Sequence, residues 1–402
     1  ALDILSDMRR GEVKPDLITF NAAISACEKG AQWLEALGIF SGMRQRRLEP
    51  NVITHNAAIS SYGKSAKWRE AVGMYSDMRQ RGMEPSIVTY SATINACSSG
   101  ARWQEALGMF SDMQLRRVEA NVIVFSGAIS ACAQGALWHE ALGTFADMRQ
   151  HRLEADAITY NSAISACEKG SHWYAALSMW FDMRRRQVHP DVITCNTVIS
   201  SCERGAQWQE ALGIYSGMRQ RSLNADAITH NAAINACGKG AQWQAALGMF
   251  SGMERCSLEP DEISYNAAID AIAACERWQD ALCMMADMHS RCLELTVITC
   301  SVATSACARG ANWLAALGVL ADMWKRRFSA DAIIYNAVVR ACGTCAHWQE
   351  SLGILFDMRW RNLEADVITC SASIDACEHG AQSRLLPRLL FDIPRGVQDS
   401  ER

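Results

Sequence analysis

Asn-Ala-Ala-Ile-Ser stands at residues 21–25 and returns unchanged at residues 56–60, 35 residues further along the chain. Variants of this motif continue at the same interval, with no insertion or deletion between them. The motif begins at Asn21, Asn56, Ser91, Ser126, Asn161, Asn196, Asn231, Asn266, Ser301, Asn336 and Ser371. Eleven units in one register indicate a repeat architecture, in which each unit is one supersecondary element that stacks on its neighbours.

Each unit has the pattern of two helices, as the stretch Asp156–Asp191 illustrates. Tyr160, Ile164 and Cys167 follow the i, i+4, i+7 spacing of one apolar stripe. Gly170 is expected to end the first helix, and Gly or a substitute recurs at that place in every unit. The predicted apolar stripe of the second helix consists of Trp173, Ala176, Leu177, Phe181 and Met183.

A lone hairpin of this kind cannot bury both stripes, so neighbouring units must stack. We therefore predict an all-α fold, a right-handed superhelical α-solenoid of about eleven 35-residue helix-turn-helix repeats. The predicted organisation is a partial repeat at 1–16 that holds only a second helix, ten complete repeats at 17–366, and a degenerate last repeat with a C-terminal tail at 367–402.

The composition is that of a folded protein, because 50% of the residues are hydrophobic and 20% are charged. Charged residues interrupt every apolar run, so we expect no membrane span. Nine of the seventeen cysteines recur at one phase of the repeat, which indicates buried, reduced thiols and not a disulfide framework or a metal site. They are Cys27, Cys97, Cys132, Cys167, Cys202, Cys237, Cys307, Cys342 and Cys377.

A second face of the first helix carries residues that packing does not require. The second residue of every unit is aliphatic, and the fifth is always Asn or Ser. The last residue is Asp or Asn in eight of the ten complete units, with Ser86 and Thr296 as the exceptions. Two explanations remain open: helix capping alone, for which such residues are suited, and contact with a ligand. The occurrence of two polar positions and one aliphatic position on a single face favours the ligand.

One unit shows a family resemblance over the stretches Asp-Val-Ile-Thr-Cys-Asn (191–196), Trp-Gln-Glu-Ala-Leu-Gly-Ile-Tyr (208–215) and Met-Arg (218–219). At 35 residues it resembles a P-type pentatricopeptide repeat, and the resemblance covers essentially the whole chain. The related tetratricopeptide repeat has 34 residues and its Trp lies in the first helix, whereas here the recurrent Trp opens the second.

The resemblance implies that each unit binds one base of single-stranded RNA. The fifth and last residues would read the Watson–Crick edge of the base, the second residue would wedge against it, and a cation late in the first helix would touch phosphate. The implied base-recognition pairs are Asn21 with Asn51, Asn56 with Ser86, Ser91 with Asn121, Ser126 with Asp156, Asn161 with Asp191, Asn196 with Asp226, Asn231 with Asp261, Asn266 with Thr296, Ser301 with Asp331, and Asn336 with Asp366. The implied wedge residues are Ile18, Ile53, Val88, Ile123, Ile158, Ile193, Ile228, Ile263, Ile298 and Ile333. The implied phosphate contacts are Lys29, Lys64, Lys169, Arg204, Lys239 and Arg309.

The side-chain chemistry agrees with such a base code. Aspartate only accepts hydrogen bonds and suits uracil N3–H or guanine N1–H, whereas Asn also donates and suits cytosine N3 or adenine N1. A short Ser leaves room for a purine, and a longer Asn reaches a pyrimidine. Unit by unit, this predicts the target 5′-YCAGUUUYGU-3′, read from the N-terminal unit onward as the family does.

Two functions remain open. The first is sequence-specific single-stranded RNA binding in organellar RNA processing, stabilisation or translation control. The family implies the chloroplast or the mitochondrion, although Ala1–Asp16 shows no targeting segment. The second is a protein-interaction scaffold that binds a peptide in a concave groove, which the formal net charge of −4 favours.

No catalytic motif competes with these two functions. The nine histidines are scattered and form no His-Glu-x-x-His pattern, so we expect no enzymatic activity and no cofactor. Protein partners would then supply any catalysis. We expect a monomer that does not associate with membranes.

Overall fold

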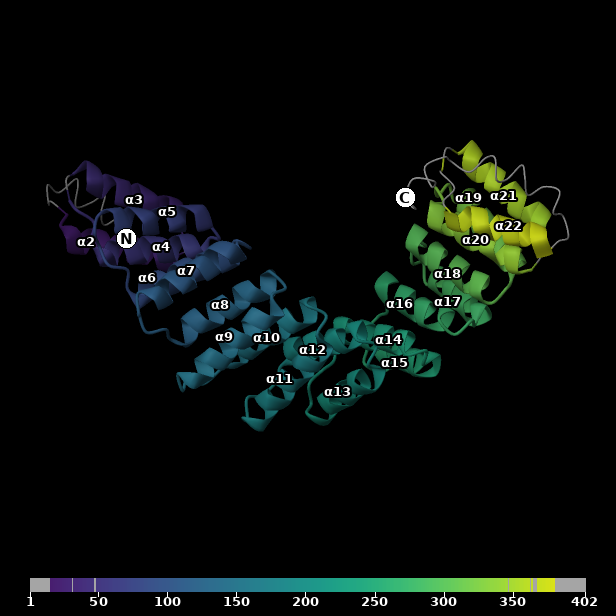
Figure 1. Ribbon diagram of the computed structural model, residues 1–402, viewed down its shortest axis with the longest axis horizontal. Coiled ribbons are helices and arrows are strands. Elements are labelled where there is room, and N and C mark those ends of the chain that lie inside the picture. The colour runs from purple at the N-terminus through teal and green to yellow at the C-terminus, as the bar shows by residue number, and fades with distance from the viewer. Residues whose placement is uncertain are drawn as a thin grey trace, which may run out of the picture. The chain divides into compact units, whose positions relative to one another are not determined.

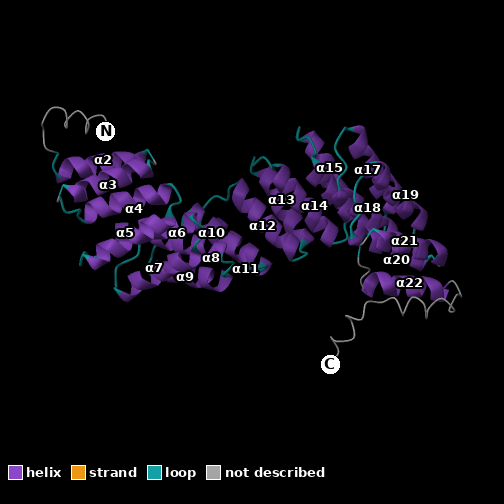
Figure 2. Cartoon of the chain, turned by 90° about the horizontal axis from the view of Figure 1, so that it is seen from above, coloured by secondary structure: helices purple, strands orange, loops and turns teal. Residues whose placement is uncertain are grey.

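The computed structural model describes residues 15–30, 32–46, 48–345, 347–361, 363 and 367–379 of the 402-residue chain. In this part the regular secondary structure is helical, and no strand occurs (Figure 2). The predicted all-α architecture of repeated helix pairs is confirmed. The partial repeat predicted at 1–16 lies almost entirely outside the described residues, as does the chain beyond residue 379.

The helices alternate between two kinds along the chain (Figure 1). The first helices of the repeats are α2 (Leu17–Lys29), α4 (Val52–Lys64), α6 (Ile87–Ser99), α8 (Val122–Gln134), α10 (Ala157–Lys169), α12 (Val192–Arg204), α14 (Ala227–Lys239), α16 (Glu262–Ala273), α18 (Val297–Arg309), α20 (Ala332–Thr344) and α22 (Val367–His379). The second helices are α3 (Trp33–Gln45), α5 (Trp68–Gln80), α7 (Trp103–Leu115), α9 (Trp138–Gln150), α11 (Trp173–Arg185), α13 (Trp208–Gln220), α15 (Trp243–Arg255), α17 (Trp278–Ser290), α19 (Trp313–Lys325) and α21 (Trp348–Trp360).

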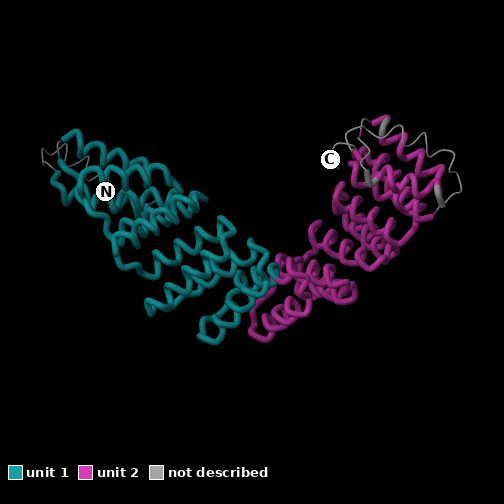
Figure 3. The backbone as a smooth tube through the Cα atoms, viewed as in Figure 1, with its two compact units in different colours: residues 1–201 teal, residues 202–402 magenta. Residues whose placement is uncertain are grey.

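The helices gather into two compact units, residues 1–201 and 202–402 (Figure 3). In the first unit α2, α4, α6, α8 and α10 pack against one another in chain order, and in the second unit α14, α16, α18, α20 and α22 do the same. Second helices such as α5 and α7 pack both on the first helix of their own repeat and on that of the next. Each unit therefore has a layer of first helices that second helices cover on one side.

The apolar stripes meet between these layers. Tyr160, Ile164 and Cys167 are fully buried, as the periodicity predicts. The prediction for the second helix is wrong at one residue, because Trp180 is buried and Phe181 is 53% exposed. Trp180 occupies the place that Phe145 has one repeat earlier. With 3.6 residues per turn, two adjacent bulky residues cannot both face the core, and the one in register with the repeat does so.

The nine cysteines that recur at one phase are all buried, in agreement with their predicted place in the core. Burial raises the pKa of Cys97 and Cys132 to about 11, and that of Cys202 to about 12. These thiols therefore stay protonated at neutral pH, in the form that packs as a small apolar group.

The glycine at the end of the first helix provides space and does not adopt the left-handed conformation. Gly240 has φ −86°, and the left-handed residue is the next one, Ala241, with φ 53°. A Cβ atom on Gly240 would lie 2.2 Å from Cδ1 of Trp208 in the preceding repeat. Equivalent close approaches join Gly100 to Trp68 and Gly170 to Trp138, each at 2.5 Å. The expectation that this glycine ends the first helix is confirmed, since Gly170 and Gly240 are the C-cap residues of α10 and α14. The same glycine also lets the tryptophan of one repeat pack against the next.

No helix in the described part of the chain is both long and apolar enough to span a membrane.

Candidate functional site

The first helices carry a series of exposed aliphatic side chains, one from each repeat between residues 17 and 366. These are the second residues of the repeats, and their exposed fractions range from 53% for Val88 to 75% for Ile18. The others are Ile53, Ile123, Ile158, Ile193, Ile228, Ile263, Ile298 and Ile333. Isolated exposed aliphatic residues are ordinary, but a regular series at one helical position is the kind of apolar surface that marks a binding site.

The last residue of each repeat caps the first helix of the next. Asn51 Oδ1 accepts the backbone N–H of Thr54 at 3.0 Å, and Asp156 Oδ1 accepts that of Thr159 at 2.9 Å. The same cap is made by Ser86, Asn121, Asp191, Asp226, Asp261, Thr296 and Asp331. Asp366, the last residue of the tenth repeat, lies outside the described residues. Capping is therefore a real role of this position, and it leaves lone pairs of the capping oxygens available to a ligand.

The fifth and last residues of one repeat are in contact in the repeats at 157–191 and 52–86. Asn161 Nδ2 donates to Asp191 Oδ1 at 3.4 Å, and Asn56 Nδ2 donates to the Ser86 hydroxyl at 3.4 Å. Both positions are therefore adjacent on the face that carries the exposed aliphatic series. Each aliphatic residue lies two positions after the capping residue of its helix and three positions before the fifth residue of its own repeat. The three positions together therefore form one repeated surface element.

A third residue, which the sequence analysis missed, links this pair. The hydroxyl of Thr194, the third residue of the following repeat, lies 2.6 Å from Asn161 Oδ1 and 2.7 Å from Asp191 Oδ1, so its one proton is shared between these two acceptors. Thr54 makes the same bridge between Asn21 and Asn51, at 2.6 and 2.9 Å. The signal was present in the sequence as Thr or Ser at the third position of most units, but its place in the buried N-terminal turn concealed it.

The carboxylate of Asp191 is ionised at neutral pH. Partial burial raises its pKa, but hydrogen bonds from the Thr194 hydroxyl, the Thr194 backbone N–H and the Asn161 amide outweigh that effect and hold the pKa below its ordinary value. The group is thus only an acceptor toward any ligand.

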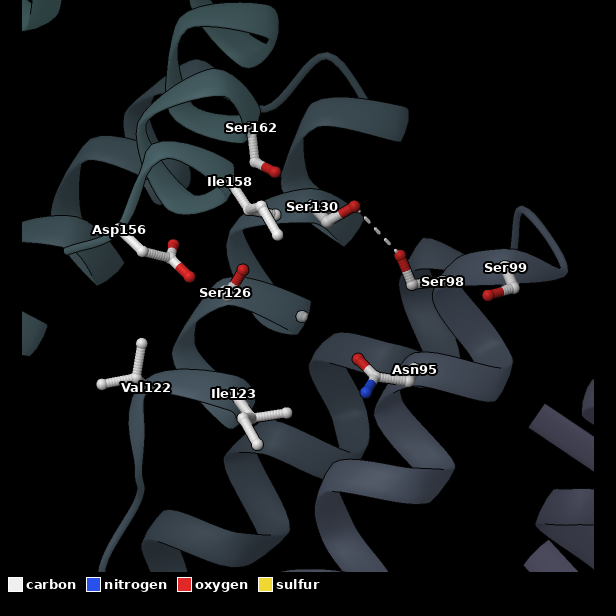
Figure 4. Close-up of a pocket in the computed structure, with 11 residues that line it drawn as sticks. Asn95, Ser98, Ser99, Val122, Ile123, Ser126, Ser130, Asp156, Ile158 and Ser162 are labelled. Carbon is white, nitrogen blue, oxygen red and sulfur yellow. Dashed lines mark hydrogen bonds between the residues drawn. The ribbon is translucent and has the colours of Figure 1, made fainter. Parts of the chain in front are cut away.

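The repeat with Ser126 as its fifth residue has a hollow of about 350 Å³ at the same surface element. In Figure 4 Ser126 lies between Ile123 and Ile158, and the Asp156 carboxylate is turned toward it. A serine hydroxyl is shorter than an Asn amide, and the neighbouring Gly127 adds no side chain. The hollow beside Ser126 is therefore bounded by small side chains.

Other predicted base-recognition residues have competing partners. The Ser91 hydroxyl donates to the carbonyl of Val88 at 3.1 Å, and Thr296 donates to Glu262 Oε1 at 2.7 Å.

The remaining predicted base-recognition residues also lie on or before first helices. Asn196 lies on α12 in the first unit, and Asp226 caps α14 in the second. Ser301 is half-buried on α18, and Asn336 accepts a hydrogen bond from Thr369.

The predicted phosphate contacts are exposed, but several are paired with acids. Lys64 Nζ lies 3.4 Å from Glu28 Oε1, Lys239 Nζ lies 3.1 Å from Glu203 Oε1, and Arg309 lies 3.9 Å from Asp270. Lys169 makes no ion pair with another described residue. In the other two pairs the acid lies 36 residues before the lysine, and the residue at that distance before Lys169 is Ala133. The first-helix cations are therefore unequal, because no described carboxylate competes with a ligand for Lys169.

No group of three or more His, Cys, Asp or Glu side chains within the described part of the chain is arranged to hold a metal ion.

Three repeat families match this sequence. The PPR repeat family matches residues 50–99, 155–204 and 190–239, and the Pentatricopeptide repeat domain matches residues 2–65 and 108–169. The PPR repeat matches residues 88–118, 228–258 and 333–363. Together these matches cover well over half of the chain. No curated protein matches the sequence.

The fold is shared with a solved structure of a repeat protein. The pentatricopeptide repeat protein PPR10 from maize is 22% identical, with a TM-score of 0.56 over 92% of this chain and 53% of its own. PPR10 in complex with an 18-nt psaJ RNA element gives 20% identity and a TM-score of 0.49, over 98% of this chain and 57% of that one. Yeast Rmd9p in complex with a 16-nt target RNA is 9% identical, with a TM-score of 0.40 over 94% of this chain and 97% of that one. This chain thus spans about half the length of PPR10.

Proposed function

Because this chain belongs to the pentatricopeptide repeat family, we propose that it binds single-stranded RNA in a sequence-specific manner, with one base per repeat. The second residue of each repeat packs against a base, and the fifth and last residues read the edge of that base. Unstacked bases of single-stranded RNA expose both a flat face and a hydrogen-bonding edge, which these residue types complement.

The observation that carries this proposal is the exposed aliphatic series. Packing and capping explain the buried stripes and the last residues, but neither requires Ile or Val at a position that is more than half exposed in each repeat from 17–51 to 332–366. A flat apolar ligand that returns once per repeat, such as a base, explains both the residue type and the period.

Replacing Ile158 with Ala should weaken RNA binding without affecting stability. The side chain is 67% exposed, so the free energy of unfolding should change by less than about 0.5 kcal/mol. Affinity for the predicted RNA should fall roughly fivefold or more, because Ala removes apolar groups whose burial against a base contributes about 1 kcal/mol. Leu115→Ala is the matched control, because Leu115 is 83% exposed on a second helix and should leave RNA affinity unchanged. Equal losses in the two variants would contradict the assignment.

Lys169→Ala should reduce RNA affinity more than Lys239→Ala does. Lys239 already has Glu203 beside it, whereas Lys169 is unpaired among the described residues. Loss of one phosphate contact should reduce the slope of log affinity against log salt by about 0.7 for single-stranded RNA. Glu203→Gln should raise affinity, since it releases Lys239. Titrations at several salt concentrations measure all three effects, and equal slopes for Lys169→Ala and the parent would remove the phosphate role of Lys169.

A protein-interaction scaffold is the second candidate. It is favoured by the net charge of −4 and by the acids that pair with first-helix cations, both of which reduce attraction for a polyanion. A peptide ligand would tolerate these acids. The two functions separate in one titration, because RNA binding depends on base sequence and weakens steeply with salt, whereas the scaffold function predicts no sequence-dependent RNA binding.

We further propose that the RNA is an organellar transcript and that binding acts on its processing, stability or translation. The repeats supply recognition only, and protein partners supply any cleavage or modification of the RNA. Incubation of the purified chain with bound RNA should leave the RNA intact, and cleavage that follows the protein through purification would contradict this division.

A further inference from the structure

The threonine that bridges the fifth and last residues also fixes the orientation of the Asn amide. Thr194 donates to Asn161 Oδ1, which leaves Nδ2 to face Asp191 Oδ1 at 3.4 Å. If the amide were turned over, Asn161 Oδ1 would face the carboxylate, and both groups are acceptors. The hydroxyl and the carboxylate therefore select the same orientation of the amide.

The sequence connects this hydroxyl with Asn at the fifth position. Each of the seven fifth-position asparagines from Asn21 to Asn336 is followed, 33 residues later, by Thr or Ser. Of the three fifth-position serines in the ten complete repeats, Ser91 and Ser301 are instead followed by Val124 and Ile334. Both aliphatic residues are buried, and their backbone N–H groups still bond to the cap at 3.0 Å. The hydroxyl is therefore dispensable for the fold and for capping, and it accompanies the Asn amide.

One repeat breaks the pattern in an informative way. Asn231 is followed by Ser264, whose hydroxyl donates to Asp261 Oδ1 at 2.8 Å. Asn231 Oδ1 is buried and has no hydrogen-bond partner. Serine lacks the methyl group that restricts the side-chain rotamer of threonine, so its hydroxyl can bond to the cap alone. The amide of Asn231 is thus not held as that of Asn161 is, although both repeats carry the same Asn and Asp pair.

We propose that the hydroxyl at the third position of the following repeat is a positioning group that sets how strongly an Asn/Asp repeat prefers uracil to cytosine. This inference rests on the proposed RNA-binding function. With Oδ1 held by Thr194, Asn161 offers a base only N–H groups, and Asp191 offers only acceptors. Uracil presents O4 beside N3–H and matches this pair.

Cytosine presents the opposite pattern, an amino group beside an unprotonated N3. An Asn amide that is free to turn can accept a hydrogen bond from that amino group, so it tolerates cytosine. The repeat at 157–191 should therefore discriminate well between uracil and cytosine, and the repeat at 227–261 should discriminate poorly. The fifth and last residues alone would predict the same preference for both repeats, because both carry Asn and Asp.

The test compares uracil with cytosine at the fifth and seventh bases of the predicted ten-base RNA, using the full chain. The parent should prefer uracil at the fifth base by about tenfold, within the range of one good edge contact, and by less at the seventh. Thr194→Val should reduce the ratio at the fifth base to about threefold or lower. Ser264→Thr should raise the ratio at the seventh base toward the parent value at the fifth, and this gain cannot come from misfolding.

Thr159→Val is the matched control. Thr159 donates to its cap Asp156 at 2.7 Å, as Thr194 does to Asp191, but it follows Ser126 and holds no amide. Guanine preference at the fourth base should survive this change. An equal loss of preference there would mean that the hydroxyl acts through the cap, which overturns the inference.

The remaining outcomes separate the two levels of the proposal. If the parent ignores the fifth base, the one-base-per-repeat function fails and the inference fails with it. If the parent prefers uracil and neither Thr194→Val nor Ser264→Thr changes a ratio, only the inference fails.

Discussion

Asn161→Ser should change the preferred base of the repeat at 157–191 from uracil to guanine. Asp191 remains to accept the N–H that uracil N3 and guanine N1 both offer. Shortening the fifth residue should open space for a purine, and the Ser126 repeat has a hollow of about 350 Å³ there, lined by Ser126 and the neighbouring Gly127. Uracil should lose and guanine should gain about 1–3 kcal/mol each, so the ratio of the two affinities should change by roughly a hundredfold or more.

The reciprocal change provides the control for this switch. Ser126→Asn should move the preference at the fourth base from guanine to uracil and leave the fifth base unaffected. Binding curves for both variants against RNAs that differ only at these two bases measure the effect. Equal weakening toward all RNAs would mean that Asn161 supports the fold or the surface in general and does not read a base.

Gly240→Ala should destabilise the protein more than an ordinary surface substitution. The new Cβ would lie 2.2 Å from Cδ1 and 2.6 Å from Cγ of Trp208, atoms near the base of that side chain. The tryptophan must shift, and overpacking of this kind costs about 1–3 kcal/mol. Because the contact joins adjacent repeats, the loss should appear as a lower free energy of unfolding in denaturant titrations.

Gly248→Ala is the matched control in the next helix. Gly248 lies within α15, and a Cβ there would meet nothing within 4 Å. This variant should be more stable than the parent by up to about 1 kcal/mol, because Ala favours the helix over Gly. If both variants gained stability, the packing of the tryptophan against the glycine would not join the repeats.

The sequence predicted the helices well because the repeat supplies eleven versions of one pattern. Tyr160, Ile164 and Cys167 share a stripe in every comparable unit, so errors at single residues average out. The misplaced Phe181 shows the limit of this approach, since it came from one unit whose neighbouring Trp180 satisfies the same spacing. The capping role of Gly240 was predicted, but its packing role was missed, because only the structure places Trp208 against this glycine.

The exposed face was predicted in its parts but not in its connections. The aliphatic second residue and the polar fifth and last residues are visible as positions with restricted residue types. The bridge from Thr194 to Asn161 joins residues 33 apart in different repeats, and the pairing of Lys64 with Glu28 spans 36. Such contacts depend on how repeats stack, which a pattern within one repeat does not contain.

Binding of the purified chain to 5′-YCAGUUUYGU-3′ RNA, against a scrambled RNA of the same composition, tests base-by-base recognition most directly. Fluorescence anisotropy at two salt concentrations gives both affinities and their salt dependence. We expect the predicted RNA to bind at least about a hundredfold more tightly than the scrambled one, since several edge contacts of about 1–3 kcal/mol are lost together. Equal affinity for both RNAs, or no binding to either at low salt, would contradict recognition of one base by each repeat.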